Sequence, residues 1–120
     1  MRLKNILIVV TDIARSKAFY KELFGLDVIT DFGGNVMLTE GLVLQEQKEW
    51  EACIGKDIHF GGHVAELYFV ENDMDAFLQK LEKSNCTIEY VSPLTEYPKG
   101  RKVIRIYDPD RHVIEVAEKN

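Results

Sequence analysis

The chain has 120 residues, and its 15 Lys and Arg against 20 Asp and Glu give a formal net charge of −5. Hydrophobic residues make up 46% and charged residues 29% of the sequence, which is typical of a folded globular domain and excludes a disordered or collagen-like chain. The acidic balance argues against nucleic-acid and anionic-membrane partners, because both need a basic surface. The longest apolar run, residues 6–10, is far too short to cross a bilayer, and no signal-peptide cleavage pattern is present. With only two cysteines, these features predict a single cytoplasmic domain with free thiols.

The first half of the chain carries one helical pattern among several strand patterns. Residues 3–10 are almost continuously apolar and β-branched, as expected of a strand that is buried on both faces. An amphipathic helix follows, with Asp12 as its N-cap and Gly25 as the glycine that ends it. Three short strands are then predicted between turn residues, at 26–30, 35–39 and 42–46.

The second half repeats this order after a connector at residues 48–62. In the connector, Trp50, Cys53 and Ile54 share helical spacing and are expected to form one packed turn. A strand opening at Glu66 precedes a helix whose apolar residues recur at helical spacing, from a cap at Asn72 to a stop at Asn85. The strands predicted after this helix are 87–91, 102–107 and 112–117.

The two halves match at a constant offset. Shifting the sequence by 61 residues lays Asp12 on Asp73 and Asn5 on Glu66. Each half then has the order strand, helix and three strands. We therefore divide the chain into module one (1–47), the connector (48–62) and module two (63–120).

Two segments resemble a known family. The run Val-Thr-Asp-Ile-Ala-Arg-Ser-Lys-Ala-Phe-Tyr-Lys-Glu-Leu-Phe-Gly-Leu (10–26) and the run Tyr-Asp-Pro-Asp-Arg-His-Val-Ile-Glu-Val (107–116) resemble the vicinal oxygen chelate superfamily. This superfamily includes glyoxalase I, bleomycin-resistance proteins, fosfomycin-resistance enzymes and extradiol dioxygenases. The resemblance implies an α+β fold in which two βαβββ modules form a glyoxalase-like mixed sheet, a half-barrel around a cavity. It also implies a homodimer that shares this cavity between its chains.

The resemblance further implies a divalent metal with four protein ligands, on the first and last strands of each module. The matching positions here are Asn5, Leu44, Glu66 and Glu115, where the glyoxalase pattern has His or Gln, Glu, His and Glu. Leu44 cannot bind a metal, and Asn5 offers only a neutral carbonyl oxygen. We therefore expect no resident metal or other cofactor. A weakly held Mg²⁺, Mn²⁺ or Ca²⁺ on Glu66, Glu115 and Asn5 is the alternative.

Several other side chains are candidates to line the cavity. Arg105 lies between Ile104 and Ile106 on a predicted strand and could anchor an anionic ligand, whereas Arg101 and Lys102 are interpreted as a solvated strand face. The aromatic residues provide more apolar area than the two helices require; they are Trp50, Phe60, Tyr68, Tyr97 and Tyr107. The predicted ligand-binding set is Asn5, Leu44, Trp50, Tyr68, Arg105 and Tyr107.

The histidines and one arginine complete the candidates. His59 and His63 are four residues apart, but the two glycines between them favour a loop over a metal-binding helix, and His112 is predicted to be a surface residue. Arg111 stands where the family has a glycine in its Asp-Pro-Asp-Gly turn. If this turn needs a positive φ, the arginine costs about 1 kcal/mol.

The favoured function is metal-free binding of a small molecule, similar to the bleomycin-resistance branch. The competing hypothesis is a metal-dependent lyase or isomerase of the lactoylglutathione-lyase type. In that hypothesis Glu66 and Glu115 are the metal ligands or the proton-transfer pair. A third reading is a ligand-sensing regulatory protein without catalysis.

Overall fold

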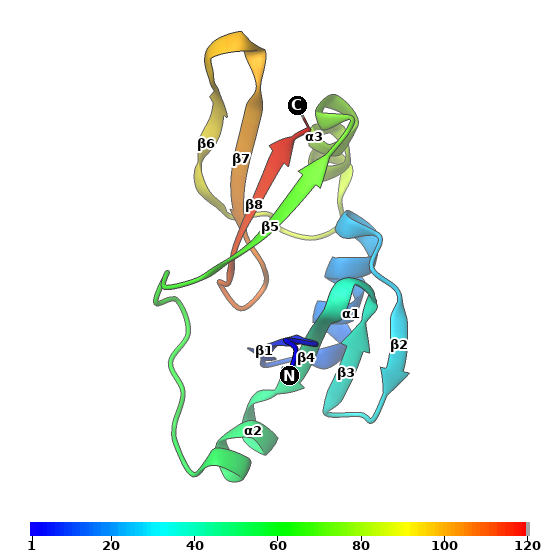
Figure 1. Ribbon diagram of the computed structural model, residues 1–120, viewed down its shortest axis with the longest axis vertical. Coiled ribbons are helices and arrows are strands. Elements are labelled where there is room, and N and C mark those ends of the chain that lie inside the picture. Colours follow the sequence, from blue (N-terminus) through cyan, green and yellow to red (C-terminus); the bar gives the residue numbers. More distant parts are fainter. Residues whose placement is uncertain (120) are drawn as a thin grey trace. The chain divides into compact units, whose positions relative to one another are not determined.

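The structure is a computed structural model that describes residues 1–119, and the chain divides into two compact units that meet between His59 and Phe60. The elements of unit one are β1 (Ile6–Val10), α1 (Ile13–Phe24), β2 (Val28–Asp31), β3 (Asn35–Leu38), β4 (Leu42–Glu46) and α2 (Gln47–Ile54) (Figure 1). Those of unit two are β5 (Glu66–Glu71), α3 (Met74–Lys83), β6 (Tyr90–Glu96), β7 (Lys102–Tyr107) and β8 (Val113–Glu118). Over residues 1–119, no helix has the length and apolar character needed to span a membrane.

Each unit contains one open, mixed sheet of four strands with the same topology. The strand orders are β1-β4-β3-β2 and β5-β8-β7-β6. In each sheet the first pair is parallel and the other pairs are antiparallel. The predicted α+β fold with two βαβββ modules is therefore confirmed, and neither sheet closes into a barrel.

Local capping chemistry sets the helix ends. Helix α1 begins after Asp12, whose carboxylate accepts the N–H of Arg15 at 3.0 Å, and ends at Gly25 with a φ of 67°. Both ends agree with the sequence prediction. Helix α3 is capped instead by Asp73, whose carboxylate accepts the N–H of Ala76 at 3.0 Å, and ends at Ser84. The predicted cap Asn72 and stop Asn85 were each wrong by one residue.

Two predicted segments differ more strongly from the structure. The strand expected at 87–91 lies at Tyr90–Glu96 and includes Pro93, which an edge strand tolerates because it needs fewer ladder hydrogen bonds. Its register with β7 is irregular on both sides of Ser92. The single packed turn expected in the connector is the two-turn helix α2, in which Trp50 is half-buried but Cys53 and Ile54 are exposed.

The face of the unit-two sheet that α3 covers is densely buried. In unit two, the buried residues of α3 and the alternate residues of β7 and β8 are at most 4% exposed; they are Met74, Phe77, Leu81, Ile104, Ile106, Ile114 and Val116. Lys102 of β7 confirms which face α3 covers, because its ammonium donates to Asp75 of α3 at 3.1 Å. Since side chains alternate along a strand, the residues between these positions lie on the other face of the sheet.

In the turn between β6 and β7, Lys99 has a strained backbone conformation that another residue type would adopt more easily. Its Gly100 N–H donates to the Tyr97 carbonyl at 3.0 Å, and the exposed Lys99 inside it has a φ of 73°. We expect Lys99→Asn to raise the free energy of unfolding by about 0.5–1 kcal/mol, because Asn tolerates the left-handed region better than Lys. Urea unfolding followed by circular dichroism measures this gain. Lys99→Ala is the control and should give none, so an equal gain from alanine would contradict the explanation.

Candidate functional site

Strand register corrects the alignment of the two modules. Tyr68 on β5 pairs with Glu115 on β8, and Leu7 on β1 pairs with Val43 on β4. The 61-residue offset lays Leu7 on Tyr68, so the structural counterpart of Glu115 is Val43. The sequence alignment had placed Leu44 there and was wrong by one residue.

An error of one residue moves a side chain to the opposite face of a sheet. Leu44 pairs with Ile8 on β1 and Val36 on β3, and it is 0% exposed. It therefore belongs to the core of unit one, together with the fully buried Val36. Because Val43 is also apolar, the correction leaves this position unable to bind a metal.

Five of the predicted site residues share one face of the unit-two sheet. Arg105 on β7, Glu115 on β8 and Tyr68 on β5 are aligned across three neighbouring strands. The next aligned row on this face has Tyr107 on β7 and Glu66 on β5, with Val113 between them. We call the face that carries Glu66, Tyr68, Arg105, Tyr107 and Glu115 the site face. It lies opposite the face that α3 covers.

The remaining candidates belong to unit one. Asn5 is half-buried just before β1. The oxygen of its side-chain amide lies 3.7 Å from the position that a Cβ atom would take at Gly41. Trp50 is half-buried on α2.

The centre of the site face is an ion pair. The Nε–H of Arg105 donates to Oε1 of Glu115 at 2.7 Å, and the two side chains are 31% and 14% exposed. The pKa of Arg105 is raised above its ordinary value, chiefly because the Tyr97 oxygen accepts a hydrogen bond from it. Glu115 adds to this rise, and partial burial opposes it. The arginine is therefore a permanent cation that neutralises the most buried carboxylate of the site face.

A second arginine reaches across this face. Arg101 precedes Arg105 by four residues, so the strand alternation places both on the same face. Its Nη2 group donates to the Tyr68 hydroxyl at 2.8 Å, and its Nε–H donates to the Glu118 carbonyl at 3.3 Å. The sequence analysis interpreted Arg101 as solvated; the even spacing from Arg105 was the signal that could have assigned it to the site face.

The donor set of the site face does not fit a divalent metal. Glu115 already binds the Arg105 guanidinium, so a metal ion would have to displace or approach a fixed positive charge. Glu66 is exposed and lies one row away from Glu115 in the register. Among residues 1–119 there is no group of three or more His, Cys, Asp or Glu side chains that could hold a metal ion.

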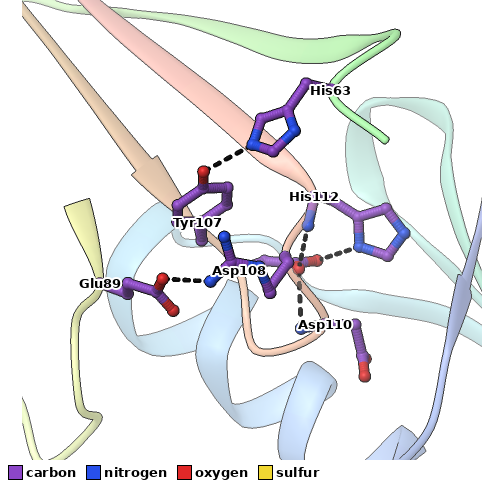
Figure 2. A network of polar contacts seen from close by, with 7 residues as sticks. His63, Glu89, Tyr107, Asp108, Asp110 and His112 are labelled. Atoms are coloured by element: carbon purple, nitrogen blue, oxygen red, sulfur yellow. Dashed lines mark hydrogen bonds and ion pairs between the residues drawn. The ribbon is translucent and has the colours of Figure 1, made fainter. Parts of the chain in front are cut away.

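A polar network lies at one end of the site face, around Tyr107 (Figure 2). Its hydroxyl is 2.6 Å from Nε2 of His63, which lies in the loop before β5. The guanidinium carbon of Arg111 lies 4.1 Å from the centre of the Tyr107 ring, and Arg111 also forms an ion pair with Glu89. The predicted site residue Tyr107 is therefore fixed by partners that nothing in the sequence pattern indicated.

The turn between β7 and β8 is held by a buried carboxylate. Asp108 accepts the backbone N–H groups of Asp110 and His112, both at 2.9 Å, and its other oxygen is 2.8 Å from Nδ1 of His112 (Figure 2). The Asp108 side chain is 0% exposed. Arg111 inside this turn has a φ of 69°, so the condition under which the arginine costs about 1 kcal/mol is met.

Arg111 offsets its backbone strain with side-chain contacts, and this can be tested. We expect Arg111→Ala to lower the free energy of unfolding by about 1–2 kcal/mol, because it loses the Tyr107 and Glu89 contacts and keeps the strain. Arg111→Gly loses the same contacts but removes about 1 kcal/mol of strain, so it should be close to neutral. Urea unfolding of both variants measures the difference. Equal losses would show that the turn is not strained by the arginine.

Comparison with known proteins gives a consistent result. A family model described as a glyoxalase-like domain matches residues 3–119. The crystal structure of a protein of unknown function from Agrobacterium tumefaciens strain C58 is 35% identical, with a TM-score of 0.83 over 100% of this chain and 95% of that one. No curated protein matches the sequence.

Two more distant structures share the fold. A lactoylglutathione lyase from Agrobacterium tumefaciens is 22% identical, with a TM-score of 0.72 over 98% of this chain and 92% of that one. A glyoxalase/bleomycin resistance protein/dioxygenase family enzyme from Burkholderia phytofirmans PsJN is 16% identical, with a TM-score of 0.75 over 96% of both chains. At these identities the likeness concerns the fold alone.

Proposed function

Since the chain belongs to the glyoxalase-like domain family, we propose that it binds a small organic molecule on the site face without the help of a metal ion. The observation that carries this proposal is the ion pair between Arg105 and Glu115. The guanidinium of Arg105 neutralises the carboxylate of Glu115, which the family resemblance implies as a metal ligand. A metal at this position would also face the repulsion of a fixed guanidinium at close range.

The aromatic residues of the site face support a binding role. Tyr68 on the site face is 50% exposed, and Tyr97, in the turn between β6 and β7, is 41% exposed. The Tyr68 hydroxyl accepts a hydrogen bond from Arg101 at 2.8 Å. A ring that is fixed at its hydroxyl and exposed on its face is suited to stacking on a planar ligand. We further propose that the protein acts as a homodimer, which sedimentation velocity tests directly.

The competing function is that of a metal-dependent lyase or isomerase. The observation that favours it is the shared face of Glu66 and Glu115, which lie on adjacent strands one row apart. This function requires Glu115 to leave Arg105 and bind the metal.

Metal analysis separates the two functions. Untagged protein is dialysed against Mn²⁺, Ni²⁺ or Zn²⁺, then against metal-free buffer, and its metal content is determined in parallel with that of Glu115→Gln. We expect substoichiometric metal in both proteins. Stoichiometric metal that is lost in the Glu115→Gln variant would overturn the proposal in favour of the lyase or isomerase.

Binding itself is tested with a mixture of neutral, cationic and anionic planar fragments in buffer that contains EDTA. The ¹H–¹⁵N spectrum of the full chain reports which strands a fragment contacts. We expect hits that shift resonances of β5, β7 and β8. A library that leaves these strands unperturbed would contradict binding at the site face.

A further inference from the structure

We propose that the Arg105 guanidinium recognises the carboxylate of a planar organic acid, whose ring lies against the tyrosines of the site face. This inference rests on the proposed binding function and names the chemical class of its ligand. It follows from the unused donors of Arg105, from the second arginine on the same face and from the exposed rings beside them.

The hydrogen-bond inventory of Arg105 leaves donors for a ligand. A guanidinium has five N–H donors in one plane. The Nε–H donates to Glu115 at 2.7 Å, and even with the Tyr97 oxygen near the group, at least three donors have no partner among residues 1–119. Because the Arg105 side chain is 31% exposed, these donors are partly desolvated but still accessible. Two parallel N–H groups of a guanidinium match the two oxygens of a carboxylate.

Glu115 makes the arginine a prepared binding group. Its carboxylate, on the neighbouring strand β8, accepts the Nε–H of Arg105 at 2.7 Å. A side chain that is already held by a partner loses less conformational freedom when a ligand binds. The charge of Glu115 cancels the charge of Arg105. The pair by itself would therefore attract anions only weakly, and a carboxylate would bind to it mainly through hydrogen bonds.

Arg101 supplies the positive charge that the Arg105 pair lacks. Among residues 1–119 it contacts the Tyr68 hydroxyl and the Glu118 carbonyl and no carboxylate. On the other face of the sheet, by contrast, Lys102 is paired with Asp75. The net charge of the chain is −5. An arginine on the same face as Arg105 that pairs with no carboxylate of the described residues gives this surface a local preference for anions.

Tyr68 selects the shape of the acid. It is aligned with Glu115 in the register, so its side chain stands beside the Arg105–Glu115 pair on the site face. The Tyr68 side chain is 50% exposed, and its hydroxyl accepts a hydrogen bond from Arg101. A planar acid can stack on such a ring while its carboxylate meets the guanidinium, whereas a short aliphatic acid gains only the second contact.

Three probes separate charge from shape. Benzoate has both the ring and the carboxylate, benzamide has the ring without the charge, and acetate has the charge without the ring. Each is titrated into the full chain at constant ionic strength in EDTA buffer, followed by ¹H–¹⁵N spectra. We expect benzoate to shift resonances of β7 and β8 and to bind at least about tenfold more tightly than benzamide, as the loss of charged hydrogen bonds predicts. Acetate should also bind more weakly than benzoate.

Variants assign the effect to Arg105. Arg105→Gln should weaken benzoate binding at least about tenfold, and Arg105→Lys, which keeps the charge without the planar fork, should lie between it and the wild type. Lys102→Gln is the matched control, because it removes one positive charge from the same strand, three residues before Arg105 and on the opposite face, and it should leave benzoate binding unchanged. The dispersion of each variant's spectrum shows that the variant is folded.

The outcomes distinguish this inference from the proposed function. Equal affinity for benzoate and benzamide would overturn carboxylate recognition and leave small-molecule binding intact. Unchanged benzoate affinity in both Arg105 variants, or no benzoate binding at the site face, would also overturn the inference. Failure of the proposed function is seen separately, as stoichiometric metal on Glu115 or as a fragment mixture that perturbs none of the site-face strands.

Discussion

Replacing Asp108 with alanine is expected to lower the free energy of unfolding by about 3 kcal/mol. The Asp108 side chain is 0% exposed and accepts two backbone N–H groups while contacting the His112 ring. Alanine leaves both N–H groups without this partner, and each such buried donor costs about 1–3 kcal/mol. This turn also positions Arg111, which packs on Tyr107 at the end of the site face.

Asparagine at position 108 is the matched control. It keeps one oxygen for the N–H groups of Asp110 and His112, but it replaces the charged oxygen that faces the His112 ring with an amide. We therefore expect Asp108→Asn to lose about half as much stability as Asp108→Ala. Urea unfolding followed by circular dichroism measures both losses. A loss below about 1 kcal/mol for alanine would mean that water replaces the carboxylate in the turn.

The sequence predicted the bounds of those helices and strands that end at a capping residue or at a turn residue. The ends of α1 follow from Asp12 and Gly25, and the bounds of β4 and β7 follow from apolar runs between turn residues. Strand β6 was predicted to end at residue 91, before Pro93, because a proline interrupts an inner strand; an edge strand tolerates it. The edge position of β6 depends on the strand order of the whole sheet and cannot be predicted from the residues of β6 alone.

The site was predicted as a set of positions but not as a set of contacts. Strand alternation assigned Arg105 and Glu115 to faces opposite their apolar neighbours, and the structure brings these two together. Their pairing depends on the register of β7 against β8, which no local pattern fixes. The same uncertainty of one residue placed Leu44 where the structure has Val43. Likewise, the contact between His63 and Tyr107 joins residues 44 apart in the chain, and sequence spacing gives no signal for it.

The pair of Arg105 and Glu115 should contribute far more to stability than an ion pair on the surface. Removal of one partner from a fully buried pair costs about 3–5 kcal/mol, and exposed pairs contribute about 0.2–1 kcal/mol. At 31% and 14% exposure this pair lies between these limits. We expect Arg105→Ala to lower the free energy of unfolding by about 2 kcal/mol, because it leaves the more buried Glu115 charge alone. Glu115→Ala should cost less, since the Arg105 side chain left unpaired is 31% exposed and therefore better hydrated than Glu115, which is 14% exposed.

A double-mutant cycle isolates the interaction, and the chain supplies its own control. The pair of Lys21 and Asp27 has side chains that are 64% and 63% exposed. We expect a coupling energy of about 1–2 kcal/mol for Arg105 and Glu115 and below about 0.5 kcal/mol for Lys21 and Asp27. In 0.5 M NaCl the second value should vanish and the first should persist, because salt screens exposed charges more than half-buried ones. Equal coupling energies in the two pairs would mean that Glu115 is held no more firmly than a surface carboxylate, and the ion pair would then be no obstacle to a metal at the site face.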